Sequence, residues 1–167
     1  KLQGKEYSYY LPPAWLDTFT PTLEKFSCWW HWYDVHKMRE HLLLYSIEEH
    51  LKLVKCEPTD LEVHATLANA YVILSSLYSS PKKIEQYEED RWVPIERFSE
   101  EMKEKFRITA EHAIEEFKIL NDYAPNDPWV HAQLAYSYHD LQMPEEEIKQ
   151  YEVILSLRPD DKDTLFK

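Results

Sequence analysis

The stretch PWVHAQLAYSYHDLQMPEEEIKQYEVILSLRPDD, residues 128–161, carries the pattern from which the fold of this chain is predicted. Leu134, Ala135 and Tyr138 fall on one face of a helix, and a second helix-like stretch follows Pro144. Proline suits the first turn of a helix, because the N–H group that it lacks has no partner there. Neither helix can bury an apolar face alone, so we expect the two to stack with further helix pairs.

Three prolines indicate that this stretch is one unit of a repeat. Pro58, Pro125 and Pro159 each end a helix-like stretch. Pro125 and Pro159 are separated by a period of about 34 residues, and Pro58 and Pro125 are separated by almost exactly twice that period. Such a period is typical of stacked, repetitive architectures. The units then run over 27–60, 61–127 and 128–161, and the middle unit holds an insertion around 75–107 that is nearly as long as a unit.

The residues inside the units follow the same register. The middle unit has Leu67, Ala68 and Tyr71 where the last unit has Leu134, Ala135 and Tyr138. With the period and the terminal proline, this pattern resembles the tetratricopeptide repeat over residues 27–161. Unit one departs from it, because Asp34 and Lys37 replace a small residue and a tyrosine. The resemblance implies an all-α fold, a right-handed superhelical solenoid of antiparallel helix pairs.

The expected helices cover 21–39, 42–56, 60–79, 97–123, 127–141 and 144–157, with the start of a further helix at 162–167. Asp60 and Asp127 stand directly before apolar-periodic runs and are expected to cap them. Residues 1–20 are rich in aromatic residues and proline, and we expect this segment to cap the first helix pair of a helical domain at 21–167. The alternative is that the segment lies in the groove of the solenoid and blocks it.

The insertion at 75–107 predicts a longer helical hairpin inside the middle unit. Each of its helices would project about 8 residues, or ~12 Å, beyond its neighbours. The connecting loop would contain Tyr87 and Trp92. Because long loops in compact domains are often functional, these two residues are candidate partner contacts. The alternative is that they fold back onto the hairpin.

Composition excludes several classes of function. Gly4 is the only glycine, whereas phosphate-binding loops, dinucleotide fingerprints and nucleophile elbows need more than one. The chain has 19 basic and 31 acidic residues, a net charge of −12, which disfavours binding to nucleic acid. No apolar run is long enough for a membrane span, and no signal peptide is visible. Cys28 and Cys56 without a C-x-x-C pair are typical of a reducing compartment, so we expect a cytoplasmic protein.

The residue patterns predict no catalytic or metal site. His31, His36 and His41 are five residues apart and therefore do not converge on one side of a helix. The paired carboxylates lie on polar helix faces, where solvation is the default. We therefore predict no metal, no cofactor and no enzymatic activity.

The resemblance also implies a binding site, because members of this family bind peptides or protein partners in a concave groove lined by the first helix of each unit. The corresponding positions here are Trp32, Val35, Arg39, Asn69, Ile73, Trp129, Gln133 and Tyr136. They describe an aromatic and apolar groove with one arginine, which suits a hydrophobic segment. Five consecutive bulky residues, 29–33, cover every side of a helix, which is therefore buried on several sides or presents an aromatic surface.

The predicted function is a non-catalytic protein-interaction module that binds a peptide or protein partner through the concave groove, with the inserted hairpin as a second possible contact. Two alternatives stay open: a three-repeat chaperone of the bacterial secretion type, and a regulatory or recruiting domain of a larger enzyme. The insertion and the N-terminal extension count against the chaperone. Some co-chaperone repeats hold acidic tails with a clamp of basic residues. That clamp is absent from the corresponding groove positions of this sequence.

Overall fold

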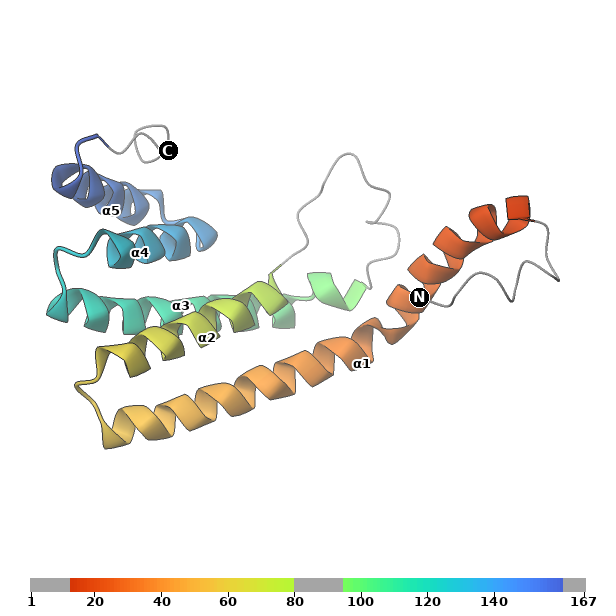
Figure 1. Ribbon diagram of the computed structural model, residues 1–167, viewed down its shortest axis with the longest axis horizontal. Coiled ribbons are helices and arrows are strands. Elements are labelled where there is room, and N and C mark those ends of the chain that lie inside the picture. Colours follow the sequence, from red (N-terminus) through yellow and green to blue (C-terminus); the bar gives the residue numbers. More distant parts are fainter. Residues whose placement is uncertain (1–12, 80–94, 161–167) are drawn as a thin grey trace.

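The computed structural model describes residues 13–79 and 95–160, and in these ranges every regular element is a helix (Figure 1). The elements are α1 (Pro13–Cys56), α2 (Leu61–Tyr78), the short 3₁₀ helix η3 (Ile95–Phe98), α3 (Glu100–Tyr123), α4 (Pro128–Asp140) and α5 (Pro144–Leu157). The predicted all-α class is therefore confirmed. Crossing a lipid bilayer takes a longer apolar stretch than any of these described helices offers.

Side chains at the helix starts explain several of the boundaries. Asp60 and Asp127 each accept a hydrogen bond from the backbone N–H two residues further on, at 2.9 Å, as predicted. The Ser99 hydroxyl accepts one from the third N–H of α3 at 3.3 Å. At the turn between α4 and α5, where a glycine is common, Gln142 takes a φ of 57°. The residues that the structure describes contain no glycine, so their turns form without it.

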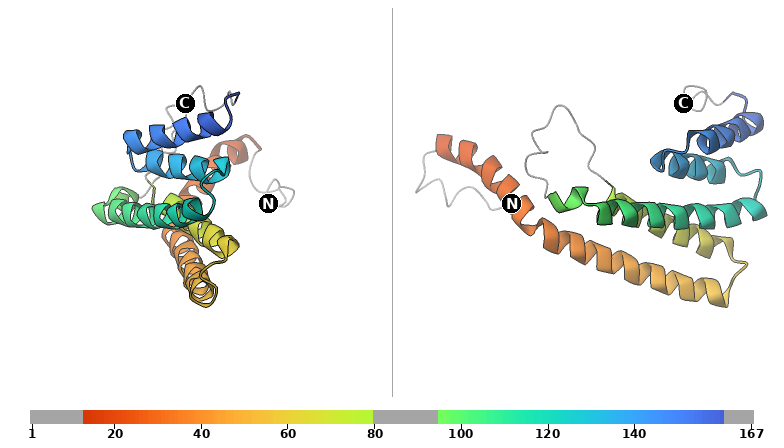
Figure 2. Two further views of the ribbon diagram at one scale, coloured as in Figure 1. Left: turned by 90° about the vertical axis from the view of Figure 1, so that its left-hand side faces the viewer. Right: turned by 180° about the vertical axis from the view of Figure 1, so that it is seen from behind.

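Helices that are neighbours in the sequence are also neighbours in space. α1 packs on α2, α2 on α3, α3 on α4 and α4 on α5, and the chain reverses direction at each connection (Figures 1 and 2). One apolar core joins α2, α3 and α4 around the fully buried Phe117. A second core joins α1, α2 and α3 around Leu67 and Leu74. Because α2 and α3 contribute to both cores, they connect α1 to the C-terminal helices.

The pairs α2/α3 and α4/α5 repeat one hydrogen-bonding arrangement. Nδ1 of the buried His64 lies 2.6 Å from Oε2 of Glu116, and its Nε2 lies 3.1 Å from the carbonyl oxygen of the proline six residues earlier. Nδ1 of His131 lies 2.8 Å from Oε1 of Gln150, and its Nε2 lies 2.9 Å from the equivalent proline carbonyl. Each histidine therefore ties its helix to the following helix and to the preceding loop.

α1 differs most from the predicted helices. The sequence predicts helices at 21–39 and 42–56 with a turn at His41, but α1 is one helix of 44 residues. The predicted turn is wrong because residues 38–44 contain neither glycine nor proline and are good helix formers apart from His41. The predicted start at Pro21 is also wrong, since α1 begins at Pro13 and contains Pro21. The expected domain boundary at residue 20 lies inside this helix.

The two arms of the insertion pack against α1. As predicted, α2 continues to Tyr78, and α3 begins early, at Glu100. They extend past α4 and α5 but, contrary to the prediction, not past α1, because the unbroken α1 runs alongside them and extends further (Figure 1). Tyr78 and Lys105 both donate hydrogen bonds to Glu40 of α1. The insertion thereby becomes part of the support for α1.

Several sequence predictions fall outside the described residues. They concern the loop contacts Tyr87 and Trp92, the part of the capping segment at 1–12 and the further helix at 162–167. They stay predictions.

Candidate functional site

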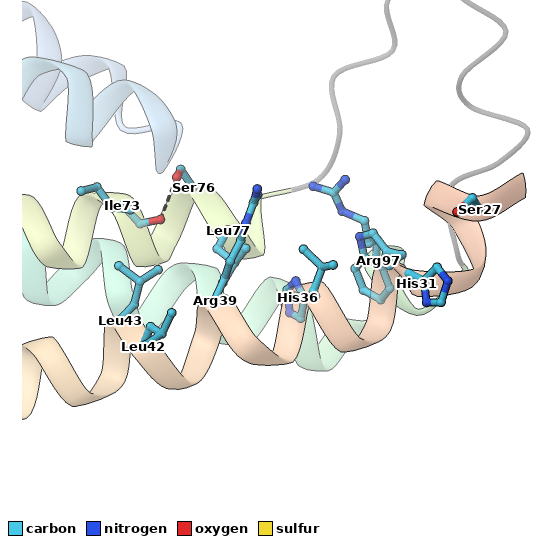
Figure 3. Close-up of a pocket in the computed structure, with 12 residues that line it drawn as sticks. Ser27, His31, His36, Arg39, Leu42, Leu43, Ile73, Ser76, Leu77 and Arg97 are labelled. Carbon is cyan, nitrogen blue, oxygen red and sulfur yellow. Dashed lines mark hydrogen bonds between the residues drawn. The ribbon is translucent and has the colours of Figure 1, made fainter. Parts of the chain in front are cut away.

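α1 and the C-terminal part of α2 enclose a groove with a volume of about 870 Å³ (Figure 3). One wall comes from α1 and the other from α2, and η3 contributes one side chain. Apolar atoms form most of the groove surface, although only half of the lining residues are apolar; the lining residues are Ser27, His31, Trp32, Val35, His36, Arg39, Leu42, Leu43, Ile73, Ser76, Leu77 and Arg97. This volume falls within the range of small-ligand sites.

The groove is positively charged within an acidic chain. Its lining includes Arg39 and Arg97 but neither aspartate nor glutamate, although the net charge of the chain is −12. Burial lowers the pKa of the Arg97 guanidinium, which donates a hydrogen bond to the Ser79 carbonyl at 3.5 Å. Within residues 13–79 and 95–160, no carboxylate forms an ion pair with either arginine. A half-buried guanidinium in this state favours binding of an anionic group.

Aromatic rings lie beside these arginines. The Trp32 ring stacks on His36 with 4.7 Å between centroids, and the Arg97 guanidinium lies 6.0 Å from the Trp32 centroid. Burial lowers the pKa of His36, and the charge of Glu40 offsets this only in part, so that His36 is neutral at pH 7. Its buried Nε2 has no hydrogen-bond partner among the described residues. In folded proteins, a buried polar atom without a protein partner usually forms a hydrogen bond with water or a ligand.

A buried carboxylate next to the groove holds three helices together. Glu40 of α1 accepts hydrogen bonds from Lys37 at 2.6 Å, from Tyr78 of α2 at 2.8 Å and from Lys105 of α3 at 3.3 Å. Burial alone would raise the pKa of Glu40, but these hydrogen bonds outweigh it and lower the pKa to about 2. Burial and the hydrogen bond to Glu40 raise the pKa of Tyr78. The ionised Glu40 therefore fixes α1 against the wall that α2 provides.

The predicted partner-binding residues divide into two groups. Those that line the groove are Trp32, Val35, Arg39 and Ile73. Those that lie on α2 and α4 and do not line it are Asn69, Trp129, Gln133 and Tyr136. Trp129 packs edge-on against Phe117, with 6.0 Å between ring centroids. The structure thus brings the α1 positions together with one α2 position, and the binding role of all eight stays a prediction.

Sequence reasoning missed several contributors to this site, among them Arg97, His36 and Leu42. Arg97 belongs to the insertion, for which the repeat pattern gives no register. Leu42 follows the turn predicted at His41, and that turn placed it on a different helix from Val35. The uninterrupted run of helix formers around His41 is the signal that could have placed Val35 and Leu42, seven residues apart, on the same side of one helix.

No group of three or more His, Cys, Asp or Glu side chains suited to a metal ion occurs in the described part of the chain. Both cysteines lie on α1, at positions that are about 40 Å apart along a helix. A disulfide within one chain is therefore excluded, and Cys56 is exposed and free.

Comparison with models of protein families, with curated proteins and with solved structures found no match.

Proposed function

We propose that this chain is a non-catalytic protein-interaction module whose groove between α1, α2 and η3 binds a partner segment carrying an apolar side chain next to a carboxylate. The observation that carries the proposal is the pair Arg39 and Arg97 at the edge of an apolar groove, in a chain that is otherwise acidic. Figure 3 shows both arginines extending towards the same side of the groove.

Each part of such a segment has a counterpart in the groove. Val35 and Ile73 are 41% and 54% exposed, so a partner side chain that covers them removes apolar area from water. A carboxylate can accept two parallel N–H groups from a guanidinium, and the half-burial of Arg97 reduces the screening of this contact by solvent. A basic segment would be repelled by the same arginines, which makes the groove selective.

The proposal extends to the architecture. The hydrogen bonds of His64 recur at His131, and the cap of Asp60 recurs at Asp127, with the same separation in the sequence for both. This recurrence supports a solenoid of antiparallel pairs resembling the tetratricopeptide repeat over α2 to α5, while α1 forms no pair of its own. Partner binding agrees with that resemblance, and a cytoplasmic location agrees with two cysteines that lie too far apart on α1 to pair with each other.

A selection from a displayed library of random peptides tests the function directly. The full chain is immobilised, and the peptides that it retains are sequenced. We expect enrichment of peptides in which Asp or Glu stands within a few residues of a large apolar side chain. The variant Arg39→Ala/Arg97→Ala should lose these peptides. The variant Arg107→Ala/Arg158→Ala is the matched control, because both of its arginines are exposed and neither lines the groove.

A second variant tests the apolar wall. Ile73→Asp places a charge in the groove at an exposed position of α2, so the fold tolerates it while binding of the selected peptides should fall at least tenfold. Ile148→Asp, at a 55% exposed position of α5, is its control and should bind as the wild type does. The proposal is wrong if no peptide is enriched, or if the same peptides bind the groove variants and the controls equally.

A further inference from the structure

α1 carries a second apolar surface on the side that faces away from the groove. We call it the outer seam, and its six residues are 36–64% exposed: Leu23, Phe26, Trp30, Tyr33, Leu44 and Leu51. Successive residues of a helix are about 100° apart, so these positions lie opposite Val35 and Leu42 of the groove. The aromatic run at 29–33 thus presents an aromatic surface, one of the two outcomes predicted for it.

The spacing of the outer seam is that of helices that pair with other helices. Positions 23, 26, 30 and 33 alternate steps of three and four residues, and 44 and 51 lie two and three seven-residue periods after 30. The intervening position holds Lys37, whose charge is paired with Glu40. Two further positions of this repeat, Ile47 and Val54, pack against α2 in the second core. The seam is therefore continuous with an existing helix–helix interface. Since α1 does not turn at residue 41, it cannot fold back to cover its own seam.

Charge favours a second copy of this chain as the occupant. Residues 19–39 have three basic and two acidic side chains, and residues 40–56 have two basic and three acidic ones. This part of α1 is therefore neutral, and the net charge of −12 lies outside it. Antiparallel pairing of two α1 helices sets the slightly basic half of one against the slightly acidic half of the other. It also places helices α2 to α5 of one copy at one end of the helix pair and those of the other copy at the opposite end. Salt screens the repulsion between the two acidic sets of helices at that separation.

The exposed area is sufficient for such a pair. The three aromatic seam residues, each with roughly 150–250 Å² of side-chain area and 45–64% exposed, offer roughly 300–350 Å² per copy. The three leucines, 36–64% exposed, add roughly 200 Å², so two copies would bury about 1,000–1,100 Å², close to the ~1,000 Å² that a specific interface needs.

We propose that two copies of this chain pair through their outer seams, helix against helix and antiparallel, around a point near Lys37. The two-fold arrangement uses the same surface of both copies and therefore closes without forming filaments. The grooves lie on the opposite side of each α1 and stay accessible.

Light scattering on the full chain after size-exclusion chromatography, between roughly 5 and 200 μM, tests the pairing. We expect a dimer for the wild type and a monomer for Trp30→Asp/Tyr33→Asp, both of whose positions are exposed. Met143→Asp/Ile148→Asp changes two exposed apolar residues outside the seam, and it should remain a dimer. A monomeric wild type at the highest concentration, or a dimer that survives the seam variant, overturns the proposal.

A distance measurement tests the antiparallel geometry. With Cys28→Ser, a spin label on the exposed Cys56 reports the separation of equivalent points in the two copies. The helix rises about 28 Å between Lys37 and Cys56, so antiparallel helices place the two labels roughly 55 Å apart. Labels that lie much closer together, on the order of two helix diameters (about 25 Å), would indicate parallel helices and would overturn the arrangement. Peptide selection does not depend on this result, because the groove needs only one copy.

Discussion

Replacing Glu40 by glutamine removes the charge that joins α1, α2 and α3 and leaves the shape of the side chain. In the wild type, three hydrogen bonds lower the pKa of Glu40 from 4.5 to about 2. Such a shift corresponds to roughly 3 kcal/mol of stability for the ionised form. The side chains of Lys37 and Lys105 are 35% and 32% exposed, so solvent weakens the interaction, and we expect a loss of about 2 kcal/mol at pH 7.

The dependence on pH identifies the cause of that loss. A carboxyl with a lowered pKa stabilises the fold above its unfolded pKa, here 4.5, and this contribution disappears as the pH falls towards 2. The difference between wild type and Glu40→Gln should therefore be full at pH 7, smaller at pH 3.5 and nearly absent close to pH 2.

Urea denaturation followed by circular dichroism at several pH values measures this difference. At pH 7 the loss should also lower the melting temperature by about 4–8 °C. Glu49→Gln is the matched control, since Glu49 pairs with Lys52 at 2.9 Å on the same helix but in an exposed position, and it should not change stability. Equal stability of wild type and Glu40→Gln at pH 7, or an equal difference at pH 7 and pH 2, would refute the reasoning.

Three further predictions concern the rest of the described chain. Burial lowers the pKa of His64, but the hydrogen bonds to Glu116 and to the Pro58 carbonyl, with the nearby carboxylate charges, outweigh it and raise the pKa, so this stabilisation is full below pH 6.5 and fades as the pH rises through the folded value. Glu116→Gln should therefore cost about 1–2 kcal/mol in urea titrations at pH 5.5 and less at pH 9. Phe117→Ala should cost about 3–5 kcal/mol by the same method, because Phe117 is fully buried. Mild oxidation should leave Cys28 and Cys56 of the monomer without an internal disulfide, as mass spectrometry can verify.

The sequence was sufficient wherever local signals and the repeat agreed. The caps Asp60 and Asp127 mark the starts of α2 and α4, and Pro144 marks the start of α5. At α1 the two signals disagreed. The repeat period required a turn near His41, whereas the residues around it favour an unbroken helix, and the helix prevails. Local propensity would have given the better prediction there.

The groove shows the same limit of sequence reasoning. The repeat register predicts Trp32 and Ile73, and both line the groove. It does not predict Arg97, because Arg97 reaches the groove from an insertion that has no equivalent in the other units. Glu40 looks like any surface carboxylate in the sequence. Its burial depends on Tyr78 and on α3, which approach it only in the folded chain.

One calorimetric comparison tests the proposed function most directly. It uses a peptide selected by the wild type and the same peptide with Lys in place of its Asp or Glu. We expect the wild type to bind the acidic peptide at least tenfold more tightly, and Arg39→Glu/Arg97→Glu, shown by circular dichroism to be folded, to prefer the Lys peptide. If both proteins rank the two peptides in the same order, the groove does not recognise a carboxylate, and the proposed function is contradicted.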